Sequence, residues 1–344
     1  VLAGCASAPQ LTAPDTGGVF DGHVDLMVHF AEKDYSGWRG PDSYDIGADT
    51  PGQVDIPKLR AGNVGGGILT LAVLHPSDKR QGLRDATGLL GALAARHAGT
   101  LQVVTGVDDI RAAAGAGRIA LLPGIEGGEQ LGDDVAMLAA AHALGIRAIT
   151  LTWTRTNALG DSSTGERRHG GLSPLGQDYV REMNRLGMLI DLSHAADATV
   201  ADVLDLSRAP VIFSHSSARA ICNTPRNLPD DLMRAAAARG GIVMVSLVPY
   251  LTDPDYLEWY ERGEAEWARL KASHPGDEPA ARAAMAAWEG RNPAPSVGIS
   301  DVADHIDHVR RVAGIGHVGI GTDFDGMYSH VEGLENASRL PALM

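Results

Sequence analysis

The chain has 344 residues, of which 44% are hydrophobic and 21% are charged, so it can form one large core. Its formal net charge of -14 at pH 7 argues against nucleic acids and anionic membrane surfaces as partners. The two cysteines, Cys5 and Cys222, cannot form a disulfide framework, and they lack zinc-finger spacing. No apolar run reaches the length of about 18 residues that a membrane-spanning helix needs.

The first residues predict a lipid anchor. Leu2-Ala-Gly-Cys5 resembles a bacterial lipobox, in which the cysteine is lipidated, and residues 6–18 have the composition of a flexible tether. We therefore interpret residues 1–18 as a lipobox remnant and a tether that holds the protein on the periplasmic side of a bacterial cell envelope through Cys5. The alternative is a chance match in an alanine-rich start, which would leave the protein cytoplasmic.

From residue 19 onward, short apolar runs alternate with helical patterns. Strands are predicted at 19–25, 66–74, 119–127, 146–152, 187–194, 209–215, 241–247 and 318–323. Helices are predicted at 56–62, 134–144, 175–186, 195–207, 230–239 and 299–313, and residues 81–107 are helix-rich. Two segments are polar loops, at 30–58 and 157–173, and the second suits a mobile loop over a site. The alternation predicts one catalytic domain at 19–344, an α/β fold of the (β/α)₈ TIM-type barrel kind.

One segment and one helix need separate interpretations. Residues 250–298 interrupt the alternation, and we predict an inserted helical pair whose aromatic residues, including three tryptophans, pack on the main body. On the helix at 299–313, His305 and His308 have the i, i+3 spacing of some metal ligands. The apolar stripe of that helix consists of Val302, Ile306, Val309 and Val312. Because the stripe would face the core, both histidines are predicted on the polar surface.

Polar side chains stand at the ends of several predicted strands. These residues are His23, Asp25, Glu126, His194, His215 and Asp323. A barrel brings the carboxyl ends of all its strands to one face, so they can share a site. Three histidines and three carboxylates suit zinc, and they suffice for two ions about 3.5–4 Å apart with a bridging carboxylate. Such a metal pair activates water and polarises a carbonyl group, which is the equipment of a metal-dependent hydrolase.

Eight stretches of the sequence carry a resemblance to a known family. They are Phe20-Asp-Gly-His-Val-Asp25, Ile56-Pro-Lys-Leu-Arg-Ala-Gly62, Gly124-Ile-Glu-Gly127, Gly171-Leu-Ser-Pro-Leu-Gly176, Asn184-Arg-Leu-Gly-Met-Leu-Ile-Asp-Leu-Ser-His194, Ala209-Pro-Val-Ile-Phe-Ser-His-Ser-Ser217, Arg226-Asn-Leu-Pro-Asp-Asp231 and Gly321-Thr-Asp-Phe-Asp-Gly326. With these stretches the chain resembles the membrane dipeptidase (renal dipeptidase) family of the amidohydrolase superfamily, as a bacterial member. They cover nearly the whole chain outside residues 250–298.

The resemblance implies a zinc-dependent dipeptidase with two Zn²⁺ ions per chain, in which a metal-bridging water attacks the peptide bond. His23 and Asp25 would bind one zinc ion, His194 and His215 the other, and Glu126 would bridge them. It also implies small dipeptides as substrates, with tolerance of a D-residue at the C-terminal position.

The resemblance assigns roles around the metal ions as well. Asp323 would be the acid/base, and Arg226 would pair with the substrate's C-terminal carboxylate, a task suited to a guanidinium group. The alternative for Arg226 is a surface salt bridge. Asn227 and Trp153 complete the predicted substrate-binding set.

Two departures from the family pattern leave alternatives open. Trp153 stands where the family often has a histidine that contacts the scissile carbonyl, and indole cannot transfer a proton. Family chains also continue beyond the equivalent of Gly333-Leu-Glu-Asn336, so we expect a truncated C-terminal end. The other functions considered are a binuclear amidohydrolase acting on N-acyl amino acids, lactams or lactones, and a non-catalytic peptide-binding lipoprotein. A homodimer stays open as the oligomeric state.

Overall fold

The computed structural model describes residues 18–75, 77–327 and 329–344. Cys5, where lipidation is predicted, lies outside the described residues. None of the helices within these ranges has the length and apolar character that crossing a membrane requires.

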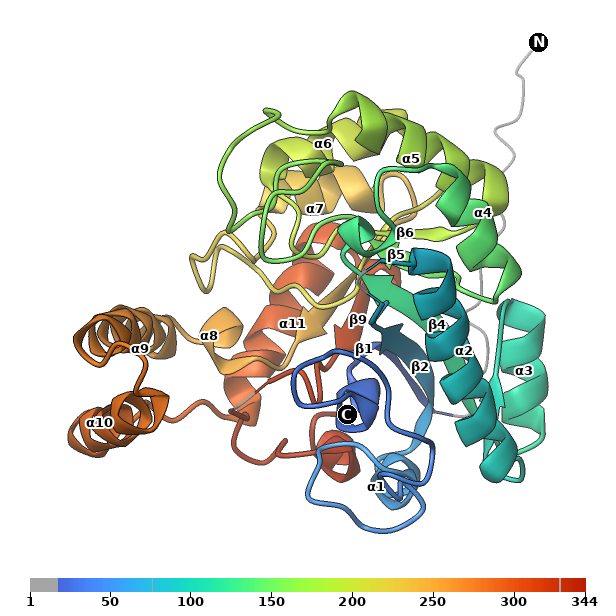
Figure 1. The fold of residues 1–344 in the computed structure, drawn as a ribbon. Coiled ribbons are helices and arrows are strands. Elements are labelled where there is room, and N and C mark those ends of the chain that lie inside the picture. Colours follow the sequence, from blue (N-terminus) through green and yellow to red (C-terminus); the bar gives the residue numbers. More distant parts are fainter. Residues whose placement is uncertain (1–17, 76, 328) are drawn as a thin grey trace.

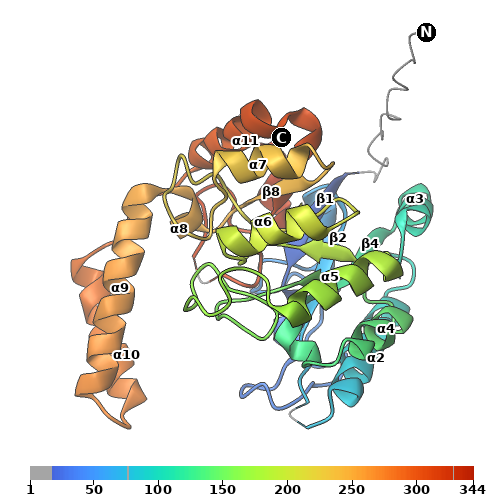
Figure 2. The same ribbon diagram turned by 90° about the horizontal axis from the view of Figure 1, so that it is seen from above.

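The centre of the molecule is a nearly closed barrel of parallel strands with helices around it (Figure 1, Figure 2). The barrel strands are β1 (Val19–Val24), β2 (Val64–Leu71), β4 (Ile119–Glu126), β5 (Ala148–Thr150), β6 (Leu189–Asp191), β7 (Ile212–Phe213), β8 (Ile242–Ser246) and β9 (Val318–Gly321). Each strand pairs in parallel with the next in this order. The predicted (β/α)₈ barrel is therefore confirmed.

The seam between the first and the last barrel strand is held by a buried aspartate. Asp21 of β1 is 2% exposed, and its carboxylate accepts hydrogen bonds from Thr322 N at 2.8 Å and from Thr322 Oγ1 at 2.6 Å. Burial raises the pKa of Asp21 to about 6, against the opposing effect of the Thr322 hydrogen bonds. Val24 and Phe324 form a parallel bridge just beyond this contact.

A short ninth strand lies outside the barrel path. β3 (Leu101–Val103) pairs in parallel with β4, with Leu101 opposite Ile119. We expected residues 81–107 to be helix-rich, and α2 does occupy 79–96, but the three residues of β3 were missed. A strand of this length carries too few side chains for a period-two pattern to be visible.

The helices follow the barrel strands in the expected alternation. They are α1 (Ile56–Ala61), α2 (Lys79–Arg96), α3 (Val107–Gly115), α4 (Ala136–Ala143), α5 (Pro174–Leu186), α6 (Asp197–Leu206), α7 (Asp230–Ala237), α8 (Pro249–Thr252), α9 (Pro254–Ser273), α10 (Glu278–Arg291) and α11 (Ile299–Ala313). Short 3₁₀ turns are η1 (Leu26–Phe30), η2 (Gly128–Leu131), η3 (Ile315–His317) and η4 (Ala337–Ala342).

α5 shows why some helix bounds were predictable. Ser173 caps its N-terminus, and Gly187, at φ 73°, ends it in the left-handed conformation.

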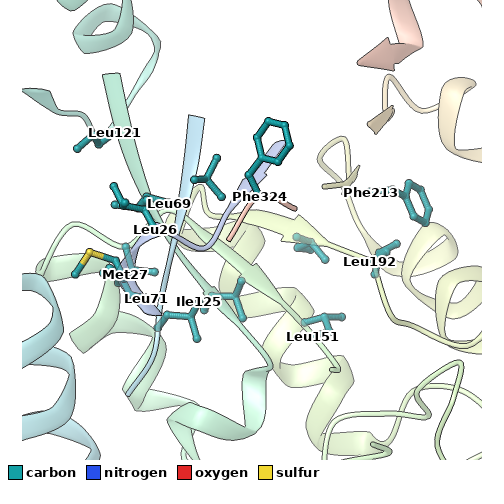
Figure 3. Packing of buried hydrophobic residues seen from close by; sticks show 14 of the residues in the cluster. Leu26, Met27, Leu69, Leu71, Leu121, Ile125, Leu151, Leu192, Phe213 and Phe324 are labelled. Carbon is teal, nitrogen blue, oxygen red and sulfur yellow. The ribbon is translucent and has the colours of Figure 1, made fainter. Parts of the chain in front are cut away.

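The barrel strands are apolar on both faces. Leu69 and Leu121 belong to the main hydrophobic cluster, whereas their chain neighbours Ile68 and Leu122 belong to a second one. Figure 3 shows Leu26 and Met27, from the turn after β1, beside the β2 residues. Because successive side chains of a strand point to opposite faces, this pattern is that of parallel strands covered on both sides.

The segment at 250–298 forms an α9–α10 hairpin that extends away from the barrel (Figure 2). The predicted helical pair is confirmed, and the expected packing on the main body holds for Tyr250, Tyr260 and, among the three tryptophans of the segment, Trp259. This indole packs against the main core and donates its Nε1–H to Asn292 O at 2.7 Å. The ring centroids of Trp288 and Trp259 are 6.1 Å apart, and the cationic groups of Lys271 and Arg282 lie over the ring of Trp267. Trp267 and Trp288 thus make their ring contacts with side chains of the two hairpin helices.

The prediction that both α11 histidines are surface residues is wrong for His305. Its side chain is fully buried: Nδ1 accepts a hydrogen bond from Ala218 N at 2.9 Å, and Nε2 contacts Thr252 O at 2.8 Å. His305 lies on the buried face of the helix together with Val302 and Val309, at a spacing of three and four residues. We overlooked it because we assigned only apolar residues to that face. His308 is partly buried and pairs with Asp230 at 2.7 Å.

The loop at 157–173 has more internal support than the predicted mobile loop would have. Asp161 is 2% exposed, and its carboxylate accepts hydrogen bonds from the backbone N–H groups of Arg168, His169 and Gly170. Asn157 accepts from the N–H of Leu159 at 2.8 Å. The loop is therefore packed around its own polar side chains, as compact functional loops are.

Candidate metal centre and active site

The six polar residues predicted at strand ends come together at one end of the barrel. His23 lies in β1, Glu126 is the last residue of β4, and the others lie within three residues of the ends of β1, β6, β7 and β9. Three overlapping groups have ligand atoms within 4.8 Å of one another: His23, Asp25 and Glu126; Glu126, His194 and His215; and His23, His215 and Asp323. The prediction that a barrel would unite these residues is confirmed.

One carboxylate oxygen occupies the middle of the cluster. Glu126 Oε1 lies 3.0 Å from His194 Nε2, 3.3 Å from His215 Nε2 and 3.7 Å from His23 Nε2. Asp25 Oδ2 lies 3.6 Å from the same Nε2 atom of His23. The geometry places Glu126 between two sets of ligands, where a bridging carboxylate would stand.

The ring nitrogens of His194 and His215 show that this cluster has the donor atoms a metal ion needs. His194 Nε2 and His215 Nε2 are only 2.9 Å apart, and both face Glu126. Burial lowers the pKa of His194 to about 4 and lowers the pKa of His215 well below its usual value, so both rings are neutral at pH 7. Neutral imidazole nitrogens beside a carboxylate are the donor set of a zinc-type site. These residues therefore fit a divalent cation.

The rest of the cluster carries an excess of negative charge. Burial would lower the pKa of His23, but the carboxylates of Asp25, Glu126 and Asp323 outweigh it and raise that pKa well above its usual value. Burial, with Asp25 and Glu126 nearby, raises the pKa of Asp323 well above its usual value, although His23 and Arg226 oppose this. A cation among these carboxylates would favour the ionised form of each acid.

Two site residues have an uncommon backbone conformation. His194 and Asp323 have φ values of 67° and 62°, in the left-handed region that non-glycine residues rarely adopt. Around Asp323 the chain is crowded: a Cβ atom at Gly326 would lie 2.2 Å from Asp25 Oδ2 and 2.6 Å from Asp323 Oδ1. Such strain is found where the surrounding structure fixes functional side chains.

The loop that carries Asp323 is fastened to the long loop before α1. Asp325, with φ 67°, donates its N–H to Gln53 Oε1 at 2.8 Å, and Gln53 N donates to Asp325 Oδ1 at 2.6 Å. His29 Nε2 lies 3.1 Å from the same Asp325 oxygen. The sequence interpretation missed these contacts, which hold the end of β9 in place.

Arg226 is a buried residue beside the cluster and not a surface ion pair. Its side chain is 7% exposed, and its Nη2 lies 3.4 Å from His215 O. Its Nε and Nη1 atoms are buried without a hydrogen-bond partner in the part of the chain that the structure describes. A buried guanidinium with free donors is a ready partner for an anionic ligand. The surface salt bridge considered as an alternative is therefore wrong.

The two other residues predicted to bind substrate have different positions. Asn227 is 1% exposed, and its side-chain amide contacts Ser217 N, Cys222 O and Leu251 O at 2.8–3.0 Å. These contacts give Asn227 a structural role that we did not expect. Trp153 follows β5 and is 47% exposed, so its indole is available at the surface of the loop after that strand.

A further buried aspartate contacts Ser193 and Ser214, the residues just before His194 and His215, and was also missed. Asp191, the last residue of β6, is 3% exposed and accepts hydrogen bonds from Thr150 Oγ1, Ser214 Oγ, Ser214 N and Ser193 N at 2.5–3.0 Å. Its signal in the sequence is an aspartate between Ile190 and Leu192, because a carboxylate in an apolar strand needs partners.

A (β/α)₈ barrel with a histidine and carboxylate cluster at the carboxyl ends of its strands defines a class of metal-binding barrel proteins. Residues 15–344 match the model of the family described as membrane dipeptidase (Peptidase family M19). The chain therefore belongs to the membrane dipeptidase family.

Individual relatives and structures agree with this membership. The chain is 34% identical to Dipeptidase tcpJ of Claviceps purpurea over 93% of this chain and 69% of that protein. It is 32% identical to Dipeptidase 3 of Rattus norvegicus over 94% of this chain, and it spans only 59% of the rat protein. The probable dipeptidase PvdM from Pseudomonas aeruginosa matches with a TM-score of 0.79 and 25% identity, covering 95% of this chain and 88% of that one.

A further similar structure contains a ligand. It is a metallopeptidase from Rhodobacter sphaeroides with a phosphinate mimic of the dipeptide L-Ala-D-Ala. It has a TM-score of 0.73 and 25% identity, with coverage of 96% of this chain and 92% of that chain.

Proposed function

We propose that the protein is a dipeptidase that requires two zinc ions and hydrolyses the peptide bond of dipeptides. The observation that carries this proposal is Arg226. A buried guanidinium with two unpartnered nitrogens beside a metal-ligand cluster calls for a small anionic substrate whose carboxylate it can bind. The family membership supports the choice of a dipeptide as that substrate.

Each residue of the cluster has a distinct task in this proposal. His23 and Asp25 would hold one zinc ion, His194 and His215 would hold the other, and Glu126 would be shared between the two ions. When bound, a zinc pair lowers the pKa of water and polarises a carbonyl group. Asp323 takes a proton from the attacking water and delivers it to the leaving amine, a role for which its place beside His23 and His215 is suitable.

Arg226 determines how the substrate enters. The C-terminal carboxylate of the dipeptide binds its free Nε and Nη1 donors, which places the peptide bond toward the cluster. We further propose that a D-residue is accepted at the C-terminal position, because the similar Rhodobacter sphaeroides metallopeptidase holds a mimic of L-Ala-D-Ala. Trp153 would contact the substrate from the loop after β5.

Zinc binding tests the metal part of the proposal. Purified protein, stripped with a chelator and titrated with Zn²⁺, should bind two equivalents. Glu126→Gln should weaken both sites, because a neutral amide is a poor bridge between two cations. Two zinc ions bound with unchanged affinity in Glu126→Gln would show that Glu126 does not bridge them.

Substrate analogues test the part that concerns Arg226. Dipeptides should be hydrolysed much faster than the matching dipeptide amides, which lack the C-terminal carboxylate. Arg226→Gln should remove most of this difference, because the loss of one partner of a buried charge pair costs about 2–5 kcal/mol. N-acyl amino acids keep the carboxylate but lack the free N-terminal amino group of a dipeptide. Faster hydrolysis of N-acyl amino acids than of dipeptides would therefore favour the alternative amidohydrolase function.

We also propose that the protein acts in the bacterial envelope, anchored through a lipid on Cys5. The Leu2-Ala-Gly-Cys5 motif is the support for this proposal. Mass spectrometry of the protein isolated from its native membrane fraction would reveal the acylated cysteine, and an unmodified N-terminus in the soluble fraction would contradict it.

A further inference from the structure

Asp191 lies close to the metal-ligand cluster, and its hydrogen bonds within the described residues go to Thr150, Ser193 and Ser214 and not to a metal-ligand side chain. Its carboxylate is 3% exposed, and all four hydrogen bonds that it accepts come from uncharged donors: Thr150 Oγ1 at 2.5 Å, Ser214 Oγ at 2.6 Å, Ser214 N at 2.9 Å and Ser193 N at 3.0 Å. Four donors are about the capacity of an ionised carboxylate, which is an acceptor only. The structure therefore accommodates Asp191 as a buried anion.

Ser214 connects this anion to the histidines. Its Oγ lies 2.6 Å from Asp191 Oδ2, 2.8 Å from His215 Nδ1 and 3.4 Å from His23 Nδ1. A serine hydroxyl has one proton to donate, and the short contact with the carboxylate takes it. The oxygen must then accept from the neighbouring ring nitrogen, so His215 carries its proton on Nδ1. This leaves the lone pair of His215 on Nε2, which faces Glu126 Oε1 at 3.3 Å.

The other histidine of the pair has no such support. His194 Nδ1 is buried without a hydrogen-bond partner within the described part of the chain. Among the described residues, hydrogen bonds connect only the His215 ring of this pair, whose Nε2 atoms lie 2.9 Å apart, through Ser214 to a carboxylate. Outer partners of this kind orient metal-binding histidines, and their loss typically reduces metal affinity or activity by about 10–100-fold.

We propose that Asp191 is a positioning residue that acts through Ser214 to hold the His215 ring with Nε2 unprotonated and turned toward Glu126. Its contribution to metal binding rests on the proposed zinc function, whereas its effect on the His215 ring does not. The expected effect on the two ions is unequal. Loss of the Asp191–Ser214–His215 hydrogen bonds should lower zinc affinity mainly at the site of His194 and His215, and less at the site of His23 and Asp25.

Zinc titrations of three variants test the asymmetry. Asp191→Asn keeps the shape of the side chain but lets its amide donate to Ser214, which frees the serine proton to point at His215. We expect Asp191→Asn and Ser214→Ala to retain one tight Zn²⁺ ion and to bind the second about 10–100-fold more weakly than the wild type. The matched control is Thr150→Val, which removes another hydrogen bond to Asp191 but leaves the path to His215 intact. The affinity of Thr150→Val for the second Zn²⁺ ion should fall by less than about 10-fold, the lower end of that range.

A second measurement needs no metal. Nitrogen-15 NMR of histidine-labelled, metal-free protein reports which ring nitrogen carries the proton, and comparison with His215→Gln identifies the His215 signals. We expect the Nδ1–H form of His215 in the wild type and in Thr150→Val, and its loss in Asp191→Asn and in Ser214→Ala. Thermal unfolding of each variant verifies that the comparison is made on folded protein.

The outcomes separate this inference from the proposed function. If the wild type bound no Zn²⁺, the zinc function would fail, and the NMR comparison would still decide how the His215 ring is held. If the wild type bound two ions and Asp191→Asn bound both as tightly, with an unchanged His215 tautomer, the positioning role would be overturned. Equal losses in Thr150→Val and Asp191→Asn would also overturn it, because they would indicate general loosening of the core.

Discussion

At the mouth of the barrel, the end that carries the metal-ligand cluster, titratable side chains are largely buried and meet partners from other strands. On the α9–α10 hairpin, charged side chains are exposed and meet partners one helical turn away. Glu126 and His194 are 12% and 8% exposed and come from β4 and the turn after β6. Arg282 and Glu278 are 70% and 62% exposed and are four residues apart in α10. Buried groups from distant parts of the chain depend on one another, and exposed neighbours contribute little. We therefore expect substitutions to have large effects at the mouth and small effects on the hairpin.

The largest effect is expected at Asp323. Asp323→Asn keeps the size of the side chain but removes the group that transfers the proton, so kcat should fall about 10²–10⁴-fold. The rate should be measured per folded, zinc-loaded molecule, with zinc content and dipeptide affinity determined on the same sample. Both should stay close to the wild-type values, since five other residues hold the metal ions. A fall of less than about 10-fold, below the usual acid/base contribution, would assign the proton transfer to another group.

An intermediate effect is expected away from the mouth, at His305. His305→Leu leaves Ala218 N–H and Thr252 C=O buried without their partner, at about 1–3 kcal/mol for each group. Urea unfolding should therefore show a loss of about 2–6 kcal/mol. The control is His308→Gln on the same helix, where the partly buried pair with Asp230 should contribute about 1 kcal/mol or less. Similar losses in both variants would contradict the different roles that we assign to them.

His305 also predicts a pH dependence. Burial lowers the pKa of His305 below its ordinary value of 6.5. The unfolded chain therefore binds a proton more readily than the folded protein, so stability falls as the pH falls below about 6.5. The stability advantage of the wild type over His305→Leu should shrink between about pH 6.5 and pH 5, as unfolding curves at several pH values would show. An advantage that is constant or grows in acid would mean that His305 is protonated in the folded protein.

The smallest effect is expected on the hairpin. Glu278→Gln removes an exposed i, i+4 partner of Arg282 and should change Tm by no more than about 2 °C, with kcat and KM for dipeptides unchanged. A marked change in KM would connect the hairpin to the substrate site and would break the contrast between the two regions.

Much of the fold could be predicted because the alternation of apolar and helical segments is strong. Ser173 and Gly187 determine the ends of α5, and the apolar run at 119–126 determines β4, so both were predicted to within a residue. The three-residue strand β3 was not predictable, because its pairing with β4 depends on a tertiary neighbour. His305 was misplaced for a related reason: its partners, Thr252 and Ala218, lie in other segments that a helical pattern does not show.

The residues of the candidate site that lie at strand ends could be predicted from the sequence. His23, Glu126, His194 and His215 are each close to the end of an apolar run, and the barrel brings these ends together. Support from behind the site is less visible, because a hydrogen bond such as Ser214 to Asp191 joins neighbouring strands with no pattern along either one. Asn227, which we predicted to bind substrate, also makes contacts that no sequence pattern shows, because its side-chain amide donates to Cys222 O and Leu251 O.

The contact between Asp21 and Thr322 has a consequence for the order in which the site assembles during folding. These residues are 301 positions apart, whereas His194 and His215 are 21 positions apart in one β-α-β unit. Closing the longer loop costs about 2 kcal/mol more chain entropy, so the seam is expected to form late. His194 and His215 would then be neighbours before His23 and Asp323 meet. Pulsed hydrogen exchange during refolding should show β6 and β7 protected before β1 and β9, and the reverse order would mean that the two ends of the barrel meet first.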